Sequence, residues 1–310
     1  MYEAGGDLDL RSRYTGLSRQ GLSRRGISMA LKIICDSAAD IGQGEMSGVF
    51  VAPMSVSFGN VTYQDGVDLT HDRFYEMLVE SDSLPTTGQV TPYGFARVLE
   101  SALDEGDEAV VMTVSSKLSG TYQSACVAAG EYGDRVRVID TLNVSLGERI
   151  LVELAKHLVA VGSGLDEVVT TIEGSRGDVQ MVALLDTLEY LRKGGRVSGL
   201  AGALGAMLSI KPVLACKSGE MILLGKARGS KNGRNLLSEQ IEAAGGVDFS
   251  LPLAVGYSGM SSALLDKYIR DSRSLWEGHV DELPMVSIGA TIGTHAGPDG
   301  IAVAFFAKGR

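Results

Sequence analysis

The sequence predicts an α/β protein, with an N-terminal mostly parallel sheet flanked by helices and a C-terminal α/β domain whose sheet is mixed or antiparallel. From Ala30 onward, short apolar runs alternate with helical segments, which is typical of strands joined by crossover helices. In the second half, two apolar runs flank the turn at 217–220, which favours a β-hairpin. The length of 310 residues is enough for two ordinary domains.

Apolar runs and their spacing predict the elements of the first half. Pro92 opens a helix because proline suits the first helical position, and Phe95, Val98, Leu99 and Leu103 form its apolar stripe. The predicted strands are 31–35, 50–58, 109–114 and 136–139. The predicted helices are 71–80, 92–105, 119–128, 145–161 and 165–173, with a glycine-rich break before the last of them.

A short polar segment near Gly177 marks the predicted boundary between an N-terminal domain, 29–177, and a C-terminal domain, 178–310. The predicted strands beyond it are 181–184, 213–216, 221–224, 253–257, 286–290 and 301–306, and the helices are 232–243 and 261–275. Residues 1–28 carry five arginines among glycine and serine, without apolar periodicity. We expect residues 1–28 to form a disordered tail, or to precede a natural start at Met29.

Composition and charge narrow the possible functions. The net charge of −10 argues against a nucleic-acid partner, because such a partner needs a basic face. Cys35, Cys126 and Cys216 are widely separated within apolar runs, which is typical of reduced thiols. No stretch approaches the roughly 18 consecutive apolar residues of a membrane span. We therefore expect a cytoplasmic protein without stable membrane insertion.

The segment from Val114 to Ala125 joins an apolar strand directly to a helix that opens with hydroxyl side chains. The first N–H groups of a helix have no intrahelical partner and lie at the positive end of the helix dipole, so they favour a carboxylate or a phosphate. Ser119 is therefore either an N-cap that satisfies its own helix or a ligand of such an anion.

Two other polar segments interrupt the apolar framework. Residues 85–92 contain Thr87, which is either a turn residue or a hydroxyl donor. Residues 289–298 contain His295, which is either a structural or a functional imidazole. Together with Ser119, these segments offer hydroxyl, amide and imidazole groups for one ligand.

Other chemistries find little support in the sequence. The four histidines show no metal-ligand spacing, so we expect no metal. The glycine-rich segment 194–202 fits neither the dinucleotide fingerprint nor the phosphate loop, so we expect no nucleotide cofactor. Ser119 lies outside the G-x-S-x-G pattern of hydrolases, although His295 could serve it as a base.

Positive charge is concentrated in residues 190–196 of an otherwise acidic chain. The cations are Arg192, Lys193 and Arg196. We expect the segment to be a solvent-facing loop, which is either a solvated turn or a patch that docks a partner or a phosphate, since guanidinium groups match phosphate geometry.

These segments, in this order, resemble the DegV family of bacterial fatty-acid-binding proteins over about residues 31–306. The motifs that carry the resemblance are Cys-Asp-Ser-Ala-Ala-Asp at 35–40, Tyr-Gln-Asp-Gly-Val-Asp-Leu-Thr at 63–70, the Thr87 turn, Ser-Ser-Lys-Leu-Ser-Gly-Thr at 115–121, the run 186–196, and Gly-Thr-His-Ala-Gly-Pro at 293–298. A single motif of this kind is weak evidence, whereas the ordered set is specific.

The resemblance implies a two-domain carrier without a cofactor, which buries one long-chain fatty acid between its domains and is not itself an enzyme. It implies that Thr87, Ser119 and His295 hold the carboxylate, and these groups are donors without a full positive charge. It further implies that a separate ATP-dependent fatty-acid kinase uses the bound acid and docks on the basic segment that contains Arg192, Lys193 and Arg196.

The chain departs from the family pattern after Thr87 and after Pro298, where Asp299 adds an acid that either orients His295 or caps a turn. The fold class is distantly shared with dihydroxyacetone-type kinases, and fold does not decide function. The alternative hypothesis is therefore an enzyme of kinase or hydrolase type that uses His295 or Ser119 covalently. A third hypothesis is a regulatory module that docks partners through the basic segment.

Overall fold

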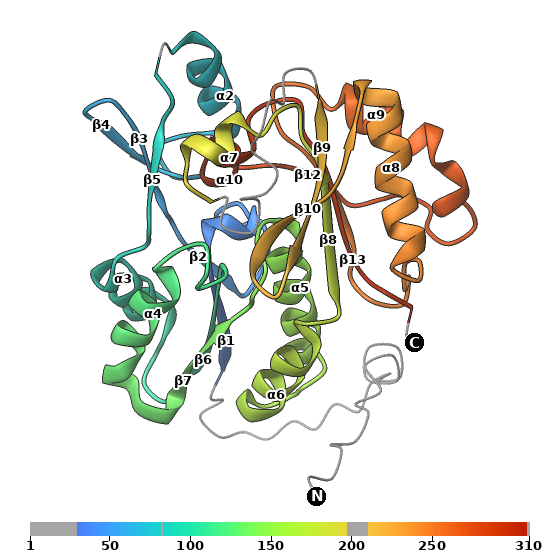
Figure 1. The fold of residues 1–310 in the computed structure, drawn as a ribbon. Helices are drawn as coiled ribbons and strands as arrows, with labels where there is room; N and C mark the ends of the chain where they lie inside the picture. The colour runs from blue at the N-terminus through green and yellow to red at the C-terminus, as the bar shows by residue number, and fades with distance from the viewer. Residues whose placement is uncertain (1–29, 82, 197–209, 309–310) are drawn as a thin grey trace, which may run out of the picture.

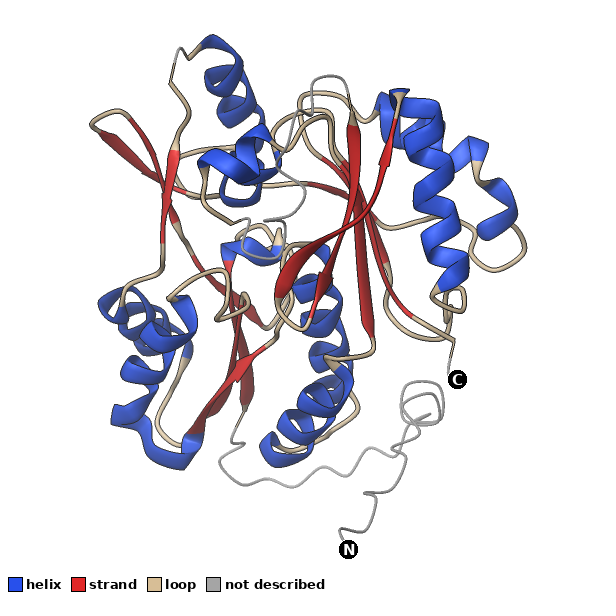
Figure 2. Ribbon diagram, viewed as in Figure 1, coloured by secondary structure: helices blue, strands red, loops and turns tan. Residues whose placement is uncertain are grey.

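The computed structural model describes residues 30–81, 83–196 and 210–308, and it confirms the predicted α/β class (Figures 1 and 2). The tail 1–28 and part of the glycine-rich segment 194–202 lie outside the described residues. The described strands form a four-stranded, a six-stranded and a three-stranded sheet.

The four-stranded sheet belongs to the first half and is parallel throughout, in the order β2-β1-β6-β7. Its strands are β1 (Leu31–Asp36), β2 (Val49–Ala52), β6 (Glu108–Thr113) and β7 (Val136–Asp140). Figure 1 shows helices α3 and α4 on one side of this sheet, and α5 and α6 on the other. These helices are α3 (Pro92–Ala102), α4 (Thr121–Ala129), α5 (Leu146–Ala160) and α6 (Leu165–Ser175).

The six-stranded sheet has the order β10-β9-β8-β13-β11-β12. Only β11 and β12 pair in parallel, so the sheet is mixed, as predicted. Its strands are β8 (Val179–Leu184), β9 (Lys211–Lys217), β10 (Glu220–Ala227), β11 (Ala254–Tyr257), β12 (Met285–Ser287) and β13 (Ile301–Phe306). Ser218 and Gly219 both have positive φ, which is the conformation of a tight hairpin turn and confirms the predicted hairpin.

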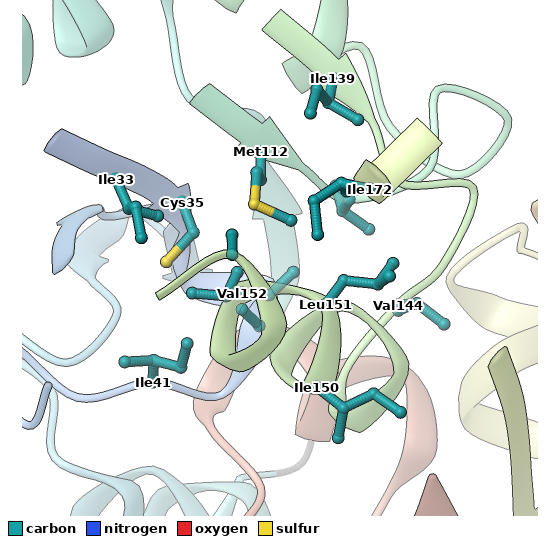
Figure 3. Packing of buried hydrophobic residues seen from close by; sticks show 14 of the residues in the cluster. Ile33, Cys35, Ile41, Met112, Ile139, Val144, Ile150, Leu151, Val152 and Ile172 are labelled. Carbon is teal, nitrogen blue, oxygen red and sulfur yellow. The ribbon is translucent and has the colours of Figure 1, made fainter. Parts of the chain in front are cut away.

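Helices α8 (Gly229–Ala243) and α9 (Ala263–Asp271) cover one face of the six-stranded sheet. Helix α5 contacts β8, β11 and β13 from the other face, and it also contacts β1 and β6 of the parallel sheet. Figure 3 shows Ile150, Leu151 and Val152 of α5 among side chains of β1 and β6 such as Ile33 and Met112. One buried cluster therefore includes residues from both halves, and the boundary near Gly177 stays a prediction.

The three-stranded antiparallel sheet has the order β4-β3-β5 and is the smallest of the three. It packs with α2 and with α10, which comes from the end of the chain. Figure 1 shows α10 beside α7 and close to this sheet. The elements are β3 (Ser55–Phe58), β4 (Val61–Gln64), β5 (Thr86–Gly88), α2 (His71–Glu80), α7 (Glu189–Lys193) and α10 (Ala290–Ala296).

Several predicted elements differ from the structure. The single strand 50–58 is wrong, because β2 and β3 are separate strands of two different sheets. The strand 286–290 is too long at its end, because Ala290 already begins α10. The predicted loop 190–196 begins as helix α7. Within the described residues, no helix is both long and apolar enough to span a membrane.

Candidate functional site

An apolar cavity lies between the parallel and the mixed sheets, with walls from both halves of the chain. The space between its walls, including the open mouth, is about 890 Å³. Most lining side chains are aliphatic. They include Ala38, Met54, Val114, Leu118, Val144, Met181, Ala183, Leu185, Leu191, Leu214, Met221, Ile288, Ile292, Ala296, Ile301 and Ala302.

All three residues that the sequence proposed as head-group ligands, Thr87, Ser119 and His295, line this cavity. Thr87 is held on β5, where it pairs with Val56 of β3, so it is a strand residue and not a turn residue. His295 is the penultimate residue of α10. The Thr87 Oγ1 lies 2.9 Å from the His295 Nε2, across 208 positions of sequence.

The imidazole of His295 is largely enclosed. Burial, together with the positive field of Arg196, lowers the pKa of His295 from 6.5 to about 4, so the ring is neutral at neutral pH. Its Nδ1 has no hydrogen-bond partner among the described residues. A buried ring nitrogen that lacks a donor costs less free energy than a buried N–H that lacks an acceptor. We therefore assign the ring proton to Nε2, which then donates to the Thr87 oxygen.

Gly194 packs directly on the imidazole of His295. An added Cβ at Gly194 would lie 2.1 Å from the His295 Nδ1 and 2.7 Å from Cε1, both far inside contact distance. Gly194 has helical backbone angles and is the C-cap of α7. The His295 ring can therefore occupy its position only because residue 194 has no side chain.

Ser119 lies just before α4, whose N-cap is Gly120 and whose first residue is Thr121. The Ser119 Oγ lies 2.8 Å from the Thr121 Oγ1 and accepts a hydrogen bond from the Thr121 N–H at 3.3 Å. Ser119 thus occupies the predicted strand-to-helix junction and is half-buried on the cavity wall. Its hydroxyl can reorient toward an anion, because it has two acceptor positions and one proton.

The structure separates the three cations of the basic segment. Arg192 and Lys193 are exposed on α7, whereas Arg196 is half-buried and lines the cavity. The Arg196 Nε donates to the Leu118 carbonyl at 3.1 Å, and its Nη1 donates to the Gly194 carbonyl at 2.7 Å. The expectation that the whole segment faces solvent is therefore wrong for Arg196. The cavity wall includes a guanidinium group beside the hydroxyl and imidazole groups.

Other sequence expectations concern residues around the site. Asp299 is exposed, has φ of 59°, and donates its N–H to the Ser258 carbonyl at 2.9 Å, so it belongs to a turn. Ser145, Ser258 and Thr291 also line the cavity and were not predicted. Among the described residues, no group of three or more His, Cys, Asp and Glu side chains has the arrangement of a metal site.

The fold and the site are those of an α/β protein with an apolar cavity between two sheets, on whose wall the Thr87 hydroxyl, the His295 imidazole and the Arg196 guanidinium lie near one another. A family model described as an uncharacterised protein of the DegV family matches residues 30–308. The chain belongs to the DegV family, as its motifs predicted.

Relatives match nearly the whole described chain. A DegV domain-containing protein of Caldanaerobacter subterraneus is 31% identical over 283 residues, which cover 90% of this chain and 99% of the relative. A solved DegV family protein from Thermus thermophilus, described by its fatty acid binding, is 33% identical with a TM-score of 0.81 and covers 90% of this chain and 100% of its own. A stearic acid-binding protein from Eubacterium ventriosum is 26% identical with a TM-score of 0.79, covering 88% and 97%.

Proposed function

We propose that this protein is a non-catalytic carrier that binds a long-chain fatty acid and presents its carboxylate to an ATP-dependent fatty-acid kinase. The observation that carries the proposal is the Thr87–His295 pair set beside Ser119 and Arg196 on the wall of an otherwise aliphatic cavity. The solved relatives that bind fatty acids support this assignment.

The two parts of the site perform different tasks. Burial of an alkyl chain contributes about 0.8 kcal/mol for each methylene, so the aliphatic walls supply affinity. The polar group supplies orientation. With the proton of His295 on Nε2, the Thr87 oxygen accepts from the ring and the Thr87 hydroxyl proton is free to donate to the carboxylate. Ser119 adds a second hydroxyl, and Arg196 adds a charge-assisted interaction.

The alternative of covalent catalysis by Ser119 or His295 finds less support. The His295 Nε2 is hydrogen-bonded to the Thr87 hydroxyl, and the Ser119 hydroxyl is hydrogen-bonded to the Thr121 hydroxyl. A histidine with a pKa of about 4 is also a weak general base at neutral pH. Native mass spectrometry of the purified protein separates these hypotheses. A carrier retains the mass of a C16 to C18 acid that is lost on denaturation, whereas an adduct that survives denaturation contradicts the proposal.

Removal of one head-group hydroxyl is expected to weaken binding without unfolding the protein. Thr87→Val keeps the shape of the side chain. Ser119→Ala removes the acceptor of the Thr121 N–H at the start of α4, which costs about 1 kcal/mol and is too little to unfold the protein. Each variant should bind palmitate about tenfold more weakly, as expected for the loss of one hydrogen bond to a charged group. The measurement is displacement of a fluorescent fatty acid.

A matched control for the hydroxyl variants is Thr62→Val. Thr62 lies on β4 of the same small sheet, and its hydroxyl pairs with Ser57 at 2.8 Å on the exposed surface. This control should bind palmitate like the wild type. Unchanged palmitate binding in both Thr87→Val and Ser119→Ala would remove the head-group assignment.

Presentation to the kinase is expected to depend on Arg192 and Lys193. Both side chains are exposed on α7, whose Leu191 lines the cavity, so a partner docked there would lie close to the ligand. The double variant Arg192→Glu, Lys193→Glu should retain palmitate while acyl-phosphate formation with a fatty-acid kinase falls about tenfold, since two attractive charges become repulsive. The control is Arg273→Glu, an exposed arginine on the far sheet face. Full turnover by the double variant would refute this docking site.

A further inference from the structure

Helix α10 is too short to be stable through its own sequence. It comprises seven residues, Ala290–Ala296, and isolated helices below about 12 residues are marginal in water. Its sequence contains two threonines and a glycine, which are weak helix formers. Its N-cap is Gly289, which supplies no side-chain hydrogen bond. The first turn of the helix that carries His295 must therefore be held by other parts of the chain.

Two buried carboxylates from the first half satisfy this first turn. Asp65 follows β4, and its Oδ1 and Oδ2 accept the N–H groups of Ala290 at 3.1 Å and Thr291 at 3.0 Å. Asp40 follows the 3₁₀ helix at residues 37–39, and its Oδ1 accepts the Gly289 N–H at 2.8 Å. Asp65 is 2% exposed and Asp40 is 3% exposed, so water does not compete for these bonds.

The packing around α10 transmits this anchoring to the ligand end of the helix. The Tyr75 hydroxyl donates to the Ile288 carbonyl at 3.1 Å, just before the helix. Gly293 lies against Phe74 and Tyr75, because a Cβ there would be 2.6 Å and 2.7 Å from their side chains. A helix fixed at its first turn and packed along one side has one rotational setting, and His295 lies two residues after Gly293.

We propose that Asp65, with Asp40, is a positioning residue for the head-group site: by accepting the first N–H groups of α10, it sets the rotation of the helix that places the His295 imidazole on Thr87. The inference rests on the proposed binding of a fatty-acid carboxylate. Asp65 does not line the cavity, and both of its carboxylate oxygens accept N–H groups of α10.

The test compares palmitate with hexadecan-1-ol, which has the same chain and no carboxylate, in displacement of a fluorescent fatty acid. Asp65→Asn replaces one acceptor oxygen by a donor group that opposes an N–H of α10. We expect palmitate to bind about tenfold more weakly and hexadecan-1-ol to bind as in the wild type. The matched control is Asp68→Asn, which removes an exposed carboxylate of the same turn that accepts the Gln64 N–H.

A second measurement follows the His295 ring directly. Its NMR titration should move from a pKa of about 4 in the wild type toward 6.5 in Asp65→Asn, because a misplaced ring becomes hydrated. A general loss of stability would weaken both ligands together, and that outcome would overturn the positioning role. If Asp65→Asn does not fold, Asp40→Asn provides the comparison when it is set against Ser145→Ala, because Asp40 accepts both the Gly289 N–H and the hydroxyl of Ser145 on the cavity wall.

The outcomes for this inference and for the proposed function are distinguishable. If the wild type does not prefer palmitate to hexadecan-1-ol, the carboxylate site itself is refuted. If the wild type has the preference and Asp65→Asn keeps it in full, the positioning role alone is refuted.

Discussion

Gly194→Ala is expected to displace the His295 imidazole and to weaken palmitate binding by more than tenfold. The new Cβ would lie 2.1 Å from Nδ1, so the ring must move by more than 1 Å to restore van der Waals contact. A shift of this size breaks the 2.9 Å contact with Thr87, which orients the hydroxyl that we assign to the carboxylate. The backbone of Gly194 has φ of −73°, so alanine introduces no conformational strain.

The measurement for Gly194→Ala is palmitate displacement together with the thermal unfolding midpoint. Alanine is the better helix former, so α7 itself should not lose stability. A matched control is Gly130→Ala, because Gly130 also has helical backbone angles, ends α4, and has open space where the Cβ would be. Wild-type palmitate affinity in Gly194→Ala would show that the ring position does not matter for the ligand.

Glu148→Gln is expected to make the free energy of unfolding much less dependent on pH. Glu148 lies in the first turn of α5 and is fully buried, and neither carboxyl oxygen has a hydrogen-bond partner among the described residues. Burial, and after it the negative fields of Asp36 and Asp40, raise the pKa of Glu148 well above its ordinary value of 4.5. The folded protein therefore favours the neutral acid form of Glu148 more strongly than the unfolded chain does.

The sign of the effect follows from proton linkage. A carboxyl with a raised pKa binds more protons in the folded than in the unfolded state, so its contribution to stability is full below pH 4.5 and is lost as the pH rises. Each proton changes the slope by about 1.4 kcal/mol per pH unit. As the pH rises above 4.5, the wild type should therefore lose more stability than Glu148→Gln, by at most about 1.4 kcal/mol for each pH unit.

Urea unfolding at several pH values measures this difference. Asp36 and Asp40 remain in the variant, and burial is the main cause that raises their pKa values to about 7. The free energy of unfolding of the variant therefore still falls to some extent as the pH rises. The control is Glu173→Gln, which removes an exposed carboxylate from α6. Parallel stability curves for the wild type and Glu148→Gln would show that Glu148 is ionised in the folded protein.

Local sequence signals were sufficient for much of the fold. Helix α2 and strand β13 have the predicted bounds, 71–80 and 301–306. Thr70 caps α2 by accepting the Arg73 N–H, and β13 is a continuous run of six buried residues. The cap of α2 is next to it in sequence, and the unbroken apolar run of β13 is itself the signal of a strand buried on both faces, so local pattern was enough to place these two elements.

The parts that sequence reasoning missed depend on distant partners. Helix α10 has weak intrinsic preference and is capped by Asp65 and Asp40, which no local pattern reveals. Strand β5 has three residues and exists through its pairing with β3. Gly195 has φ of 74°, so the chain leaves the direction of α7 at this residue. Arg196, the next residue, then lies on the cavity wall. Composition alone cannot separate an inward arginine from its outward neighbours.

The sequence distance across the α10 anchor has a consequence for biosynthesis. The hydrogen bonds that fix this helix join residues 225 to 249 positions apart in the sequence. The part of the cavity wall that contains His295 can therefore form only when almost the whole chain has been synthesised. A nascent chain that ends before residue 289 lacks both the imidazole and the helix that carries it. We therefore expect the proposed fatty acid to bind only after translation, and C-terminal truncations to bind no fatty acid even where the parallel sheet has already folded.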